Sequence, residues 1–130
     1  AGAPPADWRD YDTAYTERYL GVPGTGGADE SYKRSNLLVR AAEATSNSPL
    51  LLIHGTADDN VYFSQSLKLA QAMEQRGLPV EFYPIAGTTH LLVDPEETVR
   101  VWTRVAQFLK AGLAAEPRGD VAKPWVPEGR

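Results

Sequence analysis

Cysteine is absent from this 130-residue sequence, and histidine occurs only twice. Without cysteine the chain can form neither disulfides nor thiolate metal sites, and cysteine usage gives no clue to the redox compartment. The two histidines, His54 and His90, stand outside the H-E-x-x-H and H-x-E-H spacings that hold zinc. We therefore expect no bound metal and no cofactor.

Long apolar runs and an excess of positive charge are missing as well. No apolar segment approaches the roughly 20 residues that cross a bilayer, and the first residues lack the pattern of a signal peptide, which leaves the compartment open. The formal net charge of -4, with no basic stripe, argues against a nucleic-acid partner. With 42% hydrophobic and 23% charged residues, the composition is that of one globular domain with a modest core.

The most informative stretch is residues 50–61, which read L-L-L-I-H-G-T-A-D-D-N-V. Its apolar start, residues 50–53, is too short for a helix and predicts a strand buried on both faces. The next two residues, ending at Gly55, break this pattern, and the adjacent carboxylates Asp58 and Asp59 follow on the expected loop. In open α/β sheets, ligands and catalytic groups gather beyond the carboxyl ends of the strands, so we expect the two acids to lie there.

A second strand is predicted at residues 80–85, after an amphipathic helix at residues 62–76, and His90 follows this strand beyond a short turn. An acid and then a histidine on successive strand-end loops is the order in which α/β-hydrolases supply the last two members of a Ser-Asp-His triad. No serine has the flanking glycines of G-x-S-x-G, so the nucleophile elbow is missing. The predicted fold class is α/β, namely the carboxyl-terminal portion of an α/β-hydrolase fold with parallel strands and flanking helices.

The rest of the chain is predicted to be mostly helical. The expected elements are a short helix capped by Asp12, a glycine-rich loop at residues 21–30, and helices at residues 35–44 and 95–113. The side chains expected to face the core are Phe63, Leu67, Ala70 and Met73 in the middle helix and Thr98, Trp102, Val105 and Leu109 in the last one. Residues 1–113 then form one domain, and residues 114–130 form an extended or disordered tail rich in proline, glycine and charge.

Two motifs in this sequence resemble those of a known family. They are D-T-A-Y-T-E-R-Y-L-G at residues 12–21 and H-G-T-A-D-D-N-V at residues 54–61, with His90 after them. Together they are similar to the carboxyl-terminal part of the catalytic domain of the prolyl oligopeptidase family of serine peptidases (S9), and within it to the dipeptidyl peptidase IV branch. The resemblance covers roughly residues 8–113. An H-G-x-x-D loop alone would fit many α/β-hydrolases, whereas the two motifs together are specific.

The resemblance implies a catalytic pair. It implies that His90 is the base of the triad and Asp58 the acid. Spacing alone does not show which of Asp58 and Asp59 is the acid. Asp58 would accept the Nδ1 proton of His90 and stabilise the imidazolium form. The alternative for His90 is an ordinary histidine in a turn. His54 is expected to be structural, with its ring nitrogens tied to the loop that follows.

Five further positions match substrate-binding residues of the family. They are Trp8, Tyr11, Tyr15 and Val61, implied to line a pocket for a proline ring, and Asn60, implied to hydrogen-bond a substrate carbonyl. Two structural alternatives stay open, because aromatic residues at helical spacing often belong to a core and an Asn before a helix often caps it. Tyr19, the next ring in the series, is expected to pack in the core.

The function implied by the resemblance is cleavage of peptides after proline or a small residue. The serine of the triad would lie outside this chain, so the chain alone is predicted to be inactive. The implied partners are a peptide substrate and the missing amino-terminal part of the protein, which would hold the rest of the hydrolase domain and a β-propeller; a homodimer is also compatible. Two rivals are a carboxylesterase of the same fold and a non-catalytic interaction domain that binds through the aromatic face around Trp8 and Tyr15.

Overall fold

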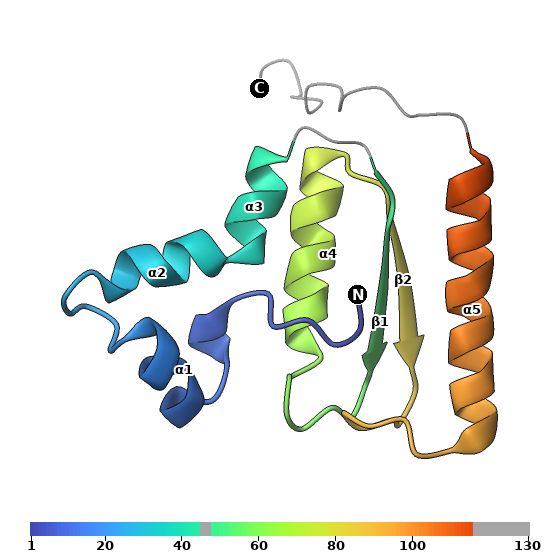
Figure 1. The fold of residues 1–130 in the computed structure, drawn as a ribbon, viewed down its shortest axis with the longest axis horizontal. Helices are drawn as coiled ribbons and strands as arrows, with labels where there is room; N and C mark the ends of the chain where they lie inside the picture. The colour runs from blue at the N-terminus through green and yellow to red at the C-terminus, as the bar shows by residue number, and fades with distance from the viewer. Residues whose placement is uncertain (45–47, 116–130) are drawn as a thin grey trace, which may run out of the picture.

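The computed structural model of the chain describes residues 1–44 and 48–115 (Figure 1). Its elements, in chain order, are the short 3-10 helix η1 (Trp8–Asp10), α1 (Thr13–Leu20), α2 (Ala28–Ser35), α3 (Leu37–Glu43), β1 (Leu50–Gly55), α4 (Ser64–Arg76), β2 (Val80–Ile85) and α5 (Pro95–Ala114). Nearly all of the tail predicted at residues 114–130 lies outside the described residues, which end at residue 115.

Two parallel strands form the centre of the fold. β1 and β2 pair along their whole length, with Leu50 opposite Val80 at the start, and α4 connects them. Figure 1 shows α4 and α5 on opposite sides of this strand pair. The first strand is two residues longer than the predicted residues 50–53, because His54 and Gly55 still pair with β2. The arrangement has the parallel strands and flanking helices of the predicted α/β class.

The first residues of the chain run beside β1 on its second edge. Gly2 forms a parallel bridge with Ile53. The Ile53 N–H donates to the Ala1 carbonyl at 2.9 Å, and the Ala3 N–H donates to the Ile53 carbonyl at 2.8 Å. β1 is therefore paired on both edges, which agrees with its continuous apolar run.

The core lies between β1 and α4. Its buried members are Ala6, Ala41, Leu52, Leu69, Ala70, Met73 and Leu78. The predicted inner stripe of this helix is partly wrong, because Leu67 is 49% exposed and Leu69 lies inside. The buried face also includes Gln65 and Ser66, two polar residues that apolar periodicity assigns to the surface. Gly77 ends the helix in the left-handed conformation, with φ of 73°.

The helix α2 begins inside the glycine-rich loop predicted at residues 21–30. Its buried side chains are Ala28 and Tyr32, four residues apart, so its apolar face is too narrow to reveal a helix by periodicity. The helix predicted at residues 35–44 starts later, because Asn36 separates α2 from α3. The Asn36 side chain caps α3 by accepting two backbone N–H groups.

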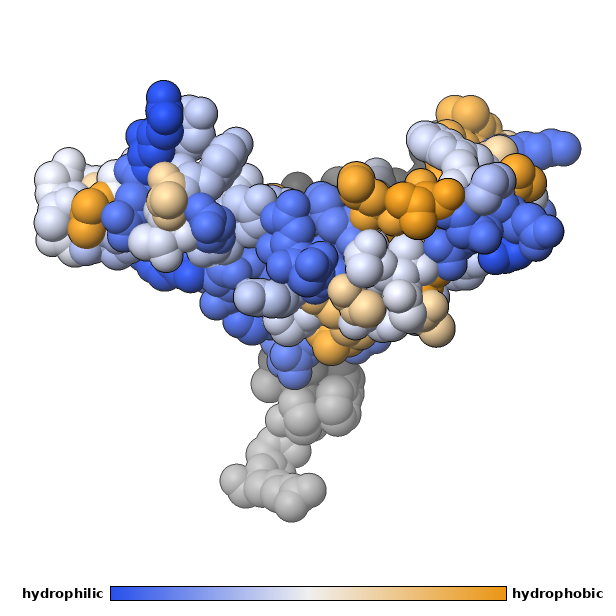
Figure 2. Space-filling model, turned by 90° about the horizontal axis from the view of Figure 1, so that it is seen from below, coloured by the Kyte–Doolittle hydropathy of each residue, from blue (hydrophilic) through white to orange (hydrophobic). Residues whose placement is uncertain are grey.

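The last helix, α5, covers the strands loosely. It is capped by Asp94 and has nearly the predicted length. Its predicted buried seam is partly wrong, because Trp102 is 64% and Leu109 54% exposed while Val101 is buried. The apolar face of α5 is wider than two strands can cover, and with β1 it lines an apolar groove of about 360 Å³. Seen from below, apolar residues gather toward the part of the molecule that carries α5, away from the arm formed by α1 and α2 (Figure 2).

Candidate active site

The loops that follow β1 and β2 meet at the carboxyl ends of the strands. The Ala57 N–H donates to the Thr88 carbonyl at 3.1 Å. Only glycine fits where the two loops approach most closely, since a Cβ on Gly55 would lie 2.2 Å from the Thr88 carbonyl oxygen. These contacts hold the loop that carries His90 against the loop that carries Asp58.

Asp58 and His90 form a hydrogen-bonded pair at this meeting point. Oδ2 of Asp58 lies 2.9 Å from Nδ1 of His90. The other oxygen, Oδ1, accepts the backbone N–H groups of Asn60 at 3.0 Å and Val61 at 2.9 Å. Because an ionised carboxylate only accepts, Nδ1 of His90 carries a proton and Nε2 is the nitrogen that can take a second one. Asp59 lies exposed on the same loop, so the structure separates two acids that look alike in the sequence.

The environment of Asp58 keeps its carboxyl ionised. Its side chain has no exposed surface, whereas that of His90 is 34% exposed. Burial raises the pKa of the Asp58 carboxyl, but the hydrogen bond from His90, the two backbone N–H bonds and the charge on His90 outweigh burial and hold the pKa below its usual value. At neutral pH the group is therefore an acceptor for the imidazole proton.

This lowered pKa predicts a loss of stability in acid. A carboxyl whose pKa is lower in the folded state contributes stability above its unfolded pKa, about 4, and that stability is lost as the pH falls through the folded pKa. In urea unfolding of the 130-residue chain, the free energy of unfolding is expected to fall below about pH 4. Asp58→Asn should remove part of this pH dependence. A variant with the same acid slope as the wild-type chain would contradict the prediction.

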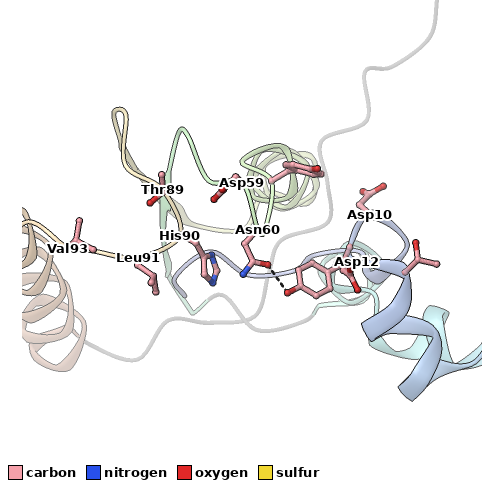
Figure 3. Close-up of a pocket in the computed structure, with 11 residues that line it drawn as sticks. Asp10, Asp12, Asp59, Asn60, Thr89, His90, Leu91 and Val93 are labelled. Carbon is pink, nitrogen blue, oxygen red and sulfur yellow. Dashed lines mark hydrogen bonds between the residues drawn. The ribbon is translucent and has the colours of Figure 1, made fainter.

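His90 lines an open cavity of about 780 Å³ (Figure 3). Its walls come from the chain around η1 and α1 and from the two strand-end loops. The lining residues are Asp10, Tyr11, Asp12, Thr13, Asp59, Asn60, Tyr62, Thr89, His90, Leu91 and Val93. The Tyr11 hydroxyl donates to Oδ1 of Asn60 at 2.8 Å, the dashed line in Figure 3, and so joins the first wall to the acid loop. Asn60 does not cap α4, whose N-cap is Phe63.

The three expected pocket aromatics form one cluster of rings. The centroid distances are 5.6 Å for Trp8 and Tyr11, 5.8 Å for Tyr11 and Tyr15, and 6.2 Å for Trp8 and Tyr15. Tyr15 is 51% exposed, so this cluster is not a buried core. Tyr19, expected in the core, is instead 64% exposed and lies against the Tyr15 ring. Val61 is buried, and its side chain is not on the cavity wall.

Gln65 of α4 fixes the segment that carries these rings, a role that the sequence analysis missed. Its buried Oε1 accepts the N–H groups of Ala6 and Asp7, both at 2.9 Å, and its Nε2 donates to the Asp7 carbonyl at 3.1 Å. Asp7 in turn caps η1 by accepting the Arg9 N–H at 3.0 Å. Gln65 lies one helical turn before Leu69 on the buried face of α4, and no local pattern in the sequence reveals its partners 58 and 59 residues away.

His54 is tied to the acid loop, as the sequence predicts. It is buried at the end of β1, and its Nε2 donates to the Val61 carbonyl at 2.8 Å. Its Nδ1 lies 2.7 Å from the Ser66 hydroxyl. The ring therefore bridges the acid loop and the first turn of α4.

The described part of the chain contains neither a metal-binding cluster nor a membrane-spanning helix. Within residues 1–44 and 48–115, no three His, Asp or Glu side chains gather as metal ligands. No helix in the same ranges is both long enough and apolar enough to cross a bilayer.

Comparison with known proteins finds relatives along most of the chain. Residues 1–116 match the family model of the Prolyl oligopeptidase family. The chain is 36% identical over 110 residues to Dipeptidyl peptidase 4 from Bos taurus and 37% identical over 110 residues to Prolyl endopeptidase FAP from Homo sapiens. Each of these alignments covers 85% of this chain and 14% of the relative. The chain thus spans a small part of the length of its curated relatives.

A solved structure shows the same fold. The crystal structure of Porphyromonas gingivalis dipeptidyl peptidase 4 matches with a TM-score of 0.78 and 32% identity, over 86% of this chain and 15% of that one. The predicted α/β class is confirmed, with the parallel strands and flanking helices of a partial α/β-hydrolase fold. By its sequence and its fold, the chain belongs to the prolyl oligopeptidase family, among relatives like dipeptidyl peptidase IV.

Proposed function

We propose that this chain supplies the acid and the base of a Ser-Asp-His triad in a serine peptidase. The observation that carries the proposal is the 2.9 Å hydrogen bond between Asp58 Oδ2 and His90 Nδ1, made beyond the carboxyl ends of two adjacent parallel strands. Membership of a peptidase family supports it. The serine lies outside residues 1–130, because those residues contain no G-x-S-x-G motif.

In the proposed mechanism, Nε2 of His90 takes the proton of the serine hydroxyl as the serine oxygen attacks the carbonyl carbon of the substrate. Asp58 holds the ring through Nδ1 and stabilises the imidazolium. The imidazolium gives its proton to the leaving amine as the C–N bond breaks, which leaves an acyl-enzyme. Water then attacks the acyl group while His90 takes its proton, and the proton returns to the serine oxygen as the acid product leaves.

The proposed substrates are peptides cut after proline or a small residue. Tyr11 lines the cavity, and the rings of Trp8 and Tyr15 pack beside it. Burial of a proline ring against such a cluster contributes on the order of 1.5–3 kcal/mol. The bond from the Tyr11 hydroxyl to Oδ1 of Asn60 leaves the amide N–H groups of Asn60 as donors for a substrate carbonyl. Val61, which the resemblance assigns to the same pocket, is buried behind the loop and is left out of this proposal. Relatives named Dipeptidyl peptidase 4 and Prolyl endopeptidase FAP support this preference.

We further propose that the chain works only within a larger protein. Residues 1–113 would complete a hydrolase domain with a preceding region that holds the serine. A β-propeller and a homodimer belong to the same proposal. The small share of its relatives that the chain covers, 14% for Dipeptidyl peptidase 4 from Bos taurus, supports this view. The isolated chain is then expected to have no peptidase activity.

The test compares two substrates on the full-length protein that contains this chain. A Gly-Pro anilide is expected to be cleaved, a fluorophosphonate to label one serine, and His90→Ala to abolish turnover. Leu67→Ala, at an exposed position of α4 outside the cavity, serves as the control and should keep turnover. Hydrolysis of a short acyl ester without amide cleavage would favour the carboxylesterase, and neither activity, with no labelled serine, would favour the interaction domain.

A further inference from the structure

A second histidine, His54, contacts the same carboxylate oxygen as His90. Nε2 of His54 lies 3.2 Å from Oδ2 of Asp58, and Nδ1 of His90 lies 2.9 Å from that oxygen. The side chains of His54 and Asp58 have no exposed surface. The Nε2–H of His54 donates to the Val61 carbonyl at 2.8 Å and also lies close to Oδ2. A buried carboxylate has lost its hydration, so it is sensitive to such a nearby N–H dipole.

The hydrogen bonds of His54 determine where its proton lies. The Val61 carbonyl, 2.8 Å from Nε2, can only accept, so Nε2 carries a proton. The buried Ser66 hydroxyl lies 2.7 Å from Nδ1 and can donate to it. The proton on Nε2 is thus directed toward the acid loop, where the Val61 carbonyl and the Asp58 carboxylate both lie.

The His54 ring is also held by packing. Phe63 meets it edge to face, with centroids 5.5 Å apart and planes at 78°. Phe63 itself stacks on Phe82 of β2, with centroids 5.5 Å apart. In the small cavity where His54, Asp58 and His90 meet, the other lining residues are uncharged. No other charged side chain on the wall of this cavity can therefore form an ion pair with His54, Asp58 or His90.

We propose that His54 is a positioning residue for the catalytic pair. Its Nε2–H donates to the Val61 carbonyl and so holds the loop that presents Asp58, and the same N–H, 3.2 Å from Oδ2, stabilises the negative charge of that oxygen. The proposal rests on the proposed triad, but His54 touches neither the substrate nor the serine and acts through Asp58. The contacts run in the order Ser66, His54, Asp58 and His90, from the first turn of α4 through the end of β1 to the loop after β2.

The first test reads the geometry of the pair without using catalysis. In the full-length protein, the Nδ1 proton of His90 should give a low-field proton resonance, assigned with ¹⁵N-labelled histidine. His54→Phe keeps a flat ring but removes the N–H, and it is expected to shift or broaden this resonance. His54→Gln places an amide N–H near the position of Nε2 and should restore it. Glu74→Gln, a charge change on an exposed side chain in the last turn of α4, should leave it unchanged.

The second test uses kinetics. Turnover of a Gly-Pro anilide is divided by the number of active sites titrated with a fluorophosphonate, so that a smaller folded fraction does not affect the result. His54→Phe is expected to lower kcat about 10- to 100-fold, by analogy with the loss on removing outer-shell partners of metal-binding histidines and carboxylates, with KM unchanged. His54→Gln should keep most of kcat. The acid limb of the pH profile should move in His54→Phe and stay in place in His54→Gln.

The outcomes separate this inference from the proposed function. A His54→Phe protein with an unchanged resonance and unchanged kcat per site would show that His54 only packs, and the inference would be overturned. Equal losses in His54→Phe and His54→Gln would overturn it too, because the N–H would then not be what matters. If the wild-type protein neither cleaves the anilide nor reacts with the fluorophosphonate, the proposed function falls, and the resonance still decides whether His54 positions the pair.

Discussion

Asp58→Asn is expected to lower kcat of the full-length protein on a Gly-Pro anilide about 10⁴-fold, by analogy with the same change in the chymotrypsin-type triad. The two carboxylate oxygens have different partners. Oδ1 accepts the backbone N–H groups of Asn60 and Val61, so the amide oxygen of the variant must stay there. The amide nitrogen then takes the place of Oδ2 and faces Nδ1 of His90. Two donors cannot bond, so His90 is driven to the tautomer with its proton on Nε2, which cannot accept the serine proton.

The neighbouring acid provides the matched control for this prediction. Asp59→Asn makes the same chemical change one residue away, on an exposed side chain, and is expected to leave kcat unchanged. Both variants are measured per active site titrated with a fluorophosphonate. A large loss in Asp59→Asn with normal turnover in Asp58→Asn would reverse the assignment of the acid. Normal turnover in both variants would show that neither acid belongs to a catalytic triad.

The spacing predicts that one of the two adjacent acids meets His90, because this prediction needs only local information. An apolar run followed by a polar loop occurs twice, and the helix between the two runs makes the strands parallel, so both loops must emerge at one edge of the sheet. Which acid meets His90 is a different matter. It depends on the turn that directs Oδ1 of Asp58 to the N–H groups of Asn60 and Val61, and spacing alone does not contain that turn.

The sequence fails where burial depends on distant partners. Gln65 and Ser66 look like surface residues of α4, yet they are buried because Gln65 pairs with backbone 58 and 59 residues away and Ser66 pairs with His54. Trp102 and Leu109 show the opposite error. They match the helical period, but two strands do not offer enough surface to cover them. Periodicity thus reports which face of a helix is apolar, while the partners available decide how much of that face is buried.

Gly55→Ala is expected to lower kcat of the full-length protein by about 10²-fold, the loss that a displacement of about 1 Å produces in an active site. The new Cβ would lie 2.2 Å from the Thr88 carbonyl oxygen and 2.7 Å from that of Thr89. Both contacts are with backbone, so no side chain can turn away and the whole loop must move. That loop carries His90, so its Nδ1 moves away from Asp58. We also expect a loss of about 1–3 kcal/mol in the free energy of unfolding, the usual cost of overpacking.

A control at a second glycine distinguishes the effect of this close contact from the general effect of replacing glycine with alanine. Gly112 lies in α5, and a Cβ there meets nothing within 4 Å. Gly112→Ala is expected to keep full activity and to gain up to about 1 kcal/mol in stability, because alanine is the better helix former. Turnover and urea unfolding of the two variants give the comparison. Full activity in Gly55→Ala would mean that the close approach of Gly55 to Thr88 does not set the position of His90, and that the hydrogen bonds between the two loops are enough to hold the pair.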